Sequence, residues 1–168
     1  MRSKVRFLAQ SALIAALYTV LTHLQNLLLP GSATWAIQFR ASEALCILAI
    51  FTPAAIPGLA IGCLLFNVTF SAALPLDFLV GTLASALAAA GMYATRRQTL
   101  FGYPLLGMLL PALFNGLLVG WELSAYIGGG FWLNAFYVAL GELAVLLILG
   151  SALYYALRLR RLDQKLFI

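Results

Sequence analysis

The sequence predicts an all-α membrane protein in which six transmembrane helices form a bundle with both termini in the cytoplasm. Hydrophobic residues make up 64% of the 168 residues and charged residues only 9%, whereas soluble domains carry about 25% charged residues. Most basic residues flank the apolar stretches, and most acids lie inside them or at their ends. Because no linker is long enough to separate two domains, residues 1–168 are expected to form one integral membrane domain.

Six apolar stretches give the expected helices, at about residues 7–29, 42–53, 57–72, 77–95, 103–122 and 132–157. The first, fourth, fifth and sixth come close to the ~20 residues that one crossing requires. The first has the basic start of a signal peptide, but no small-residue cleavage signature follows it. Pro53 and Pro57 divide the region 42–72 into two helices, because proline resists continuation of a helix.

Nine of the ten basic residues form three clusters: Arg2, Lys4 and Arg6; Arg96 and Arg97; and Arg158, Arg160, Arg161 and Lys165. Segments rich in Lys and Arg stay on the cytoplasmic side of a membrane. Six crossings bring all three clusters to that side, so we expect a multi-pass protein of the plasma membrane. The net charge of +5 suits anionic lipid headgroups better than nucleic acid, because the clusters flank apolar helices.

A second set of polar residues lies within the apolar stretches or at their outer ends: Arg40, Glu43, Asn67, Asp77, Asn115, Glu122 and Glu142. At ~1.5 Å of rise per residue, Glu142 lies ~16 Å deep, near the midplane. A carboxylate at that depth costs at least ~2.5 kcal/mol unless it faces a cavity or a partner. Four acids and one arginine give a net charge of −3 around the expected outward-facing pocket.

Several of these residues have structural alternatives. Asp77 could stabilise a helix N-terminus, and Arg40 and Glu43 could form a simple ion pair, since they are three residues apart. Glu122 could be a solvated acid at the end of its helix. These alternatives stay open at the level of sequence, whereas Glu142 is the strongest candidate for a functional residue.

Aromatic residues gather at the same outer level: Trp35, Phe39, Trp121, Tyr126, Phe131, Trp132 and Tyr137. Trp and Tyr often mark membrane interfaces, which accounts for about half of them. Carboxylates together with flat aromatic faces suit a planar ligand that is cationic or rich in hydrogen-bond donors.

The first helix carries small residues at spacings of four, Ser11 with Ala15 and Ala12 with Ala16. Such a stripe allows another helix to approach closely. It could pack within this bundle or form a partner interface.

Motifs of enzymes are absent from the sequence. It contains no HExxH, no GxSxG and no nucleotide-binding loop, and it has a single histidine. Cys46 and Cys63 lie in apolar segments without metal-type spacing, so they are interpreted as small hydrophobic residues. We therefore expect no catalytic activity, no cofactor and no metal site.

The segments QFRASEAL (38–45), FTPAAIPGLAIGCLLFN (51–67), PLDFLVGTLAS (75–85), LFNGLLVGWEL (113–123) and FWLNAFYVALGELAV (131–145) resemble the QueT family. These proteins are S-components, the substrate-binding subunits of energy-coupling factor (ECF) transporters, and are assigned to queuosine precursors. The resemblance implies the six-helix S-component fold, with substrate captured from outside. It also implies docking of the small residues of the first helix, Ala12 and Ala16 above all, on a transmembrane coupling subunit bound to two cytoplasmic ATPases.

The substrate that the resemblance implies is a 7-deazaguanine such as preQ1, preQ0 or queuine. Its guanine-type edge offers adjacent N–H donors that a carboxylate can accept as a pair. We expect Glu142 and Glu122 to supply carboxylates and Asn115 and Asn67 to complete the edge. The remaining candidates around the substrate are Glu43, Asp77, Arg40, Trp35, Trp132 and Tyr137. The alternative function is a proton-coupled multidrug-type exporter that uses a membrane-embedded Glu.

Overall fold

The computed structural model describes residues 2–32, 39–70, 73–100 and 102–163. In this part of the chain the regular elements are all helical: α1 (Arg2–Leu28), the 3₁₀ helix η1 (Ala41–Ile50), α2 (Ala55–Thr69), α3 (Asp77–Ala94), α4 (Leu105–Tyr126), α5 (Phe131–Val145), the π-helical turn η2 (Leu146–Gly150) and α6 (Ser151–Leu159). Since η2 joins α5 to α6, residues 131–159 form one continuous helix. The expectation of an all-helical protein is confirmed.

Four of the helices are long and apolar enough to cross a membrane: Ser3–Leu28, Asp77–Ala94, Leu105–Tyr126 and Phe131–Leu159. The helices Ala41–Ile50 and Ala55–Thr69 are apolar but shorter. The break between them falls at Pro53, and Pro57 is accommodated in the first turn of α2, where its missing N–H has no helical partner to lose.

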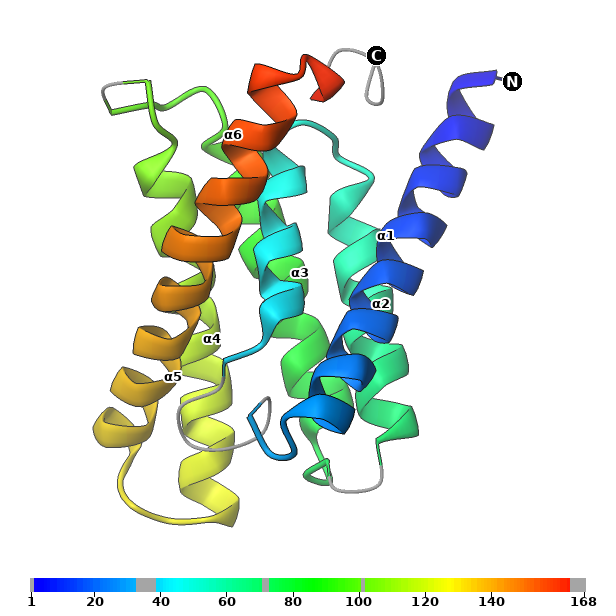
Figure 1. Cartoon of the computed structure of the whole chain (residues 1–168). Coiled ribbons are helices and arrows are strands. Elements are labelled where there is room, and N and C mark those ends of the chain that lie inside the picture. The colour runs from blue at the N-terminus through cyan, green and yellow to red at the C-terminus, as the bar shows by residue number, and fades with distance from the viewer. Residues whose placement is uncertain (1, 33–38, 71–72, 101, 164–168) are drawn as a thin grey trace.

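The short helix η1 lies at the centre of the bundle. Each of the other helices contacts it, and Figure 1 shows it (cyan) enclosed by the surrounding helices. Residues Ser42–Ala49 of η1 are all buried. The helix η1 is therefore surrounded by protein and not by lipid. For this reason it does not need the full length of a membrane span.

Close packing of α1 on α2 depends on small residues from both helices. A Cβ atom on Gly58 or Gly62 would lie 2.9 Å from the backbone oxygen of Ser11 or Ala15, respectively. The Ser11 hydroxyl also donates to the backbone oxygen of Ala54 (3.0 Å). Ser11 and Ala15 are thus buried inside the bundle. Ala12 and Ala16 are exposed. Of the four residues expected to contact a partner, these two therefore remain accessible.

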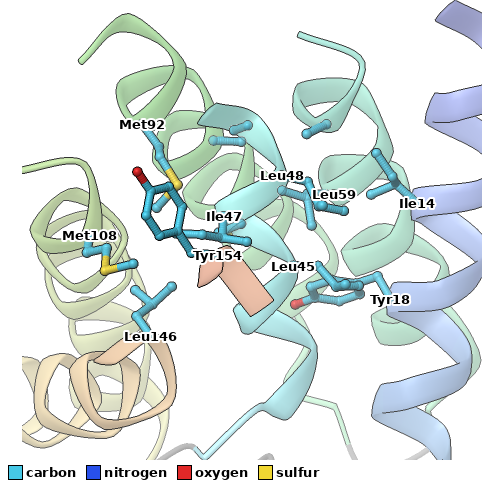
Figure 2. Close-up of a cluster of buried hydrophobic side chains, with 14 of the residues drawn as sticks. Ile14, Tyr18, Leu45, Ile47, Leu48, Leu59, Met92, Met108, Leu146 and Tyr154 are labelled. Atoms are coloured by element: carbon cyan, nitrogen blue, oxygen red, sulfur yellow. The ribbon is translucent and has the colours of Figure 1, made fainter. Parts of the chain in front are cut away.

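The largest apolar cluster surrounds η1 toward one end of the bundle. Figure 2 shows Met92, Met108, Leu146 and Tyr154 packed around Ile47 of η1. The exposed fraction of each of these five side chains is at most 1%. The start of α1, the end of α6 and the α3–α4 connection lie at this same end (Figure 1), and in the sequence these segments carry Arg6, Arg96 and Arg158. We call it the basic end.

Candidate functional site

The seven polar residues singled out within the apolar stretches are all buried. Their exposed fractions do not exceed 7%: Arg40 5%, Glu43 2%, Asn67 5%, Asp77 7%, Asn115 7%, Glu122 0% and Glu142 4%. They come from the start of η1 and from α2, α3, α4 and α5. The structure thus encloses them, instead of leaving them along an open pocket as the sequence led us to expect.

Arg40 stands among the four carboxylates. It interacts electrostatically with Glu43 and Asp77, with Glu122 and with Glu142. We call Arg40 and these four acids the charged cluster. Such interactions are strong because little water is present to screen them. A simple ion pair of Arg40 with Glu43 is therefore too narrow a description.

Two donors hold the carboxylate of Glu43. The buried Tyr18 hydroxyl donates to Oε1, and the Cys46 thiol lies 3.3 Å from Oε2. Tyr18 lies on α1, 25 residues before Glu43 in the chain, and no local pattern marks this contact. Both cysteines lie in the buried apolar cluster as free thiols, in line with their interpretation as small hydrophobic residues, and Cys63 Sγ in addition accepts from Asn67 Nδ2 (3.5 Å).

Asp77 has part of the structural role that its position predicts. Its Oδ2 accepts the N–H of Leu74 (2.9 Å), just before α3 begins. Asn67 Nδ2 donates to the backbone oxygen of Asp77 (2.8 Å) and so ties α2 to α3. Gly81 makes room for this amide, because a Cβ there would lie 2.8 Å from Asn67 Nδ2. Asp77 therefore fixes the local chain while its carboxylate interacts with Glu122.

Glu122 is not the solvated acid at a helix end that was one sequence alternative. The helix α4 continues to Tyr126, and Glu122 has 0% exposure. It interacts with Asp77 and Arg40, whereas Glu142 interacts with Glu43 and Arg40. The four acids thus form two neighbouring pairs of like charge that share one arginine.

Several polar atoms near these acids have no hydrogen-bond partner within the described residues. They are Asn67 Oδ1, Ser85 Oγ, Asn115 Nδ2, both carboxylate oxygens of Glu122 and Oε1 of Glu142. Buried polar atoms without partners are costly and rare, so a group of them requires an explanation. Most are acceptors, which favours a ligand rich in donors or carrying a positive charge.

Ser85 was missed at the sequence level, although a signal for it existed. It follows Asp77 and Gly81 at spacings of four on the buried face of α3, and this spacing places the three residues on one side of a helix. Its side chain is 1% exposed. A search for polar residues along the Asp77 face would have found it.

The expected aromatic contacts are only partly supported. Trp132 is 75% exposed on the side of α5 opposite its buried residues, and Tyr137 is half-buried; Trp35 lies outside the described residues. Trp132 is therefore not part of the buried charged cluster in this structure, and its contact with a ligand stays a prediction. Phe66, which the sequence reading passed over, is fully buried, with its ring centroid 5.6 Å from Cζ of Arg40.

The described residues include no group of three or more His, Cys, Asp or Glu side chains placed to hold a metal ion. The charged cluster is instead a set of buried acceptors around one guanidinium. This chemistry suits capture of a small molecule by hydrogen bonds and charge.

Comparison with known families gives a match of residues 8–159 to the model of the QueT transporter family. No curated protein and no solved structure matches the chain significantly. The matched range covers most of the chain and all of the charged cluster. Together with the four long apolar helices, it identifies a multi-pass membrane protein with a role in transport. The chain therefore belongs to the QueT transporter family.

Proposed function

We propose that this protein is the S-component of an ECF-type importer and captures a queuosine precursor of the 7-deazaguanine class from outside the cell. The observation that carries the proposal is the charged cluster, an enclosed group of four carboxylates and one arginine with unpartnered acceptor atoms. A deazaguanine brings N–H donors to such acceptors and a flat ring to Phe66. The family match supports the same class of substrate.

The proposed topology has six crossings with both termini in the cytoplasm. The three basic clusters at one end of the bundle support this orientation, because Lys and Arg stay on the cytoplasmic side. An even number of crossings also agrees with the two termini lying at one end (Figure 1). The shorter helices η1 and α2 would be the two crossings beyond the four long helices. A short crossing is acceptable for η1 because neighbouring helices surround it.

Energy for uptake would come from partner subunits, because the sequence contains no nucleotide-binding loop. We propose that α1 docks on a transmembrane coupling subunit, itself bound to two ATPases, through the face that carries Ala12 and Ala16. Both residues are exposed, and small residues let a partner helix approach closely. Tryptophan at both positions should abolish uptake in cells and leave ligand binding by the purified protein unchanged. Loss of binding would instead place this face of α1 in the site.

The central test is binding of preQ1, preQ0, queuine and guanine to the purified chain, measured in parallel with the variant Glu142→Gln. We expect at least one deazaguanine to bind tightly without a pH gradient, and the variant to bind it about 100-fold more weakly. Equal binding by the variant would contradict the role of Glu142. Transport that requires a proton gradient, with no binding at equilibrium, would favour the exporter alternative.

A further inference from the structure

The four carboxylates of the charged cluster differ in how many of their oxygens are already occupied. Both oxygens of Glu43 receive donors, from Tyr18 and Cys46, and Asp77 accepts the N–H of Leu74. By contrast, Oε1 of Glu142 has no hydrogen-bond partner within the described residues, and the neighbour that interacts with the oxygens of Glu122 is another acid, Asp77, and not an N–H donor. Acceptors for a ligand are thus concentrated on two of the four acids.

On the basis of the function proposed above, we infer that these two acids bind opposite ends of the ligand. Glu122, together with Asn115, reads the hydrogen-bonding edge of the guanine-type ring. Glu142, beside Glu43, holds a cationic substituent at the other end of the ring system.

The assignment of Glu122 to the ring edge rests on its two buried oxygens, which receive no N–H donor within the described residues and interact with another acid, Asp77. A carboxylate with both oxygens free accepts two parallel N–H donors, which a guanine edge supplies from its ring N–H and its 2-amino group. Asn115 Nδ2 also has no partner among the described residues and can donate to the carbonyl oxygen on the same edge.

The spacing along α4 fits this edge. Asn115 lies seven residues before Glu122 on the same face, which corresponds to ~10 Å along the helix. Side chains on one face of a helix can contact the same ligand, so Asn115 and Glu122 can bind neighbouring groups of one ring edge.

The assignment of Glu142 to a cation rests on its neighbours. It interacts electrostatically with Glu43, and both acids also interact with Arg40. Because Glu43 is already held by Tyr18 and Cys46, it contributes negative charge in a fixed position. A ligand ammonium with three N–H donors satisfies the free oxygen of Glu142 and offsets the charge of both acids.

Three ligands test the assignment: 7-aminomethyl-7-deazaguanine, its analogue without the 2-amino group, and 7-methyl-7-deazaguanine, which lacks the ammonium. We expect the full-length purified protein to bind each truncated ligand at least about 10-fold more weakly than the complete one. In Glu142→Gln the penalty for losing the ammonium should fall to about twofold, while the penalty for losing the 2-amino group persists. Glu122→Gln should show the reverse.

Asp163→Asn serves as the matched control, since Asp163 follows α6 and is not part of the charged cluster, and it should keep both penalties. The melting temperature of each variant, measured without ligand, checks that it is folded. Exchanged penalties, or unchanged penalties in both variants, would overturn the assignment while leaving the proposed function intact. If the parent protein binds none of the three ligands, the assignment fails, and if it binds neither preQ0 nor queuine either, the proposed function itself fails.

Discussion

The apolar cluster at the basic end and the charged cluster near the opposite end are built from the same helices but meet opposite requirements. One helix supplies Met92 to the first and Asp77 to the second, and another supplies Met108 and Glu122. The apolar side chains of the first cluster are buried against one another and have no polar group that requires a hydrogen-bond partner, apart from the tyrosine hydroxyls and cysteine thiols. The charged cluster is equally buried but retains unpartnered polar atoms. Burial is therefore common to both clusters, and unpartnered polar atoms distinguish the charged one.

The largest expected effect on stability lies in the apolar cluster. Met92→Ala removes a side chain with 0% exposure and should lower the free energy of unfolding by about 2–5 kcal/mol, through lost contacts and a cavity. A lower melting temperature in detergent, with an unchanged affinity for ligand in the folded protein, would confirm the separation of the two regions. A loss of affinity at unchanged melting temperature would contradict it.

The charged cluster should respond in the opposite way. Glu122→Leu removes a buried carboxyl that receives no N–H donor within the described residues, so the variant avoids the cost of burying that group, while three other acids remain around Arg40. We expect a melting temperature without ligand that is equal to or higher than that of the parent, and an affinity about 100-fold lower because the ring edge loses its acceptor. Isothermal titration calorimetry and a thermal melt measure the two quantities. Trp132→Ala, at an exposed site, is the control and should change neither.

A smaller effect is expected at the contact between the two kinds of region. Tyr18 belongs to the apolar cluster, yet its hydroxyl donates to Glu43. Tyr18→Phe keeps the ring and removes the donor, so we expect a destabilisation of about 1 kcal/mol and roughly threefold weaker binding of the aminomethyl ligand. Binding of the 7-methyl analogue should not change. An equal loss for both ligands would indicate general disruption of the site.

Much of the fold was accessible from the sequence because composition and charge position act locally. Hydropathy predicted the helices, and Pro53 with Pro57 predicted the break between η1 and α2. The acids were identified because a charge in an apolar helix is conspicuous. Their convergence on Arg40 agrees with the expectation of one common site.

The rest depended on tertiary packing that no local pattern encodes. The central position of η1 follows from contacts with every other helix. Tyr18 meets Glu43 across 25 residues of sequence, and its aromatic ring gives no sign of a polar contact. The outward orientation of Trp132 depends on which side of α5 packs on α4, where a Cβ on Gly120 would lie 2.6 Å from Cα of Ala135.

If the unpartnered atoms of the charged cluster bind a ligand as proposed, the ligand also affects the stability of the folded protein. A ligand that binds only the folded protein stabilises it by RT ln(1 + [L]/Kd), about 2.7 kcal/mol at a concentration of 100 Kd. Binding of the proposed ligand to the charged cluster would therefore make the stability of the protein depend on the ligand concentration. In a membrane exposed to proteases, the abundance of the protein should follow that supply, even at a constant rate of synthesis.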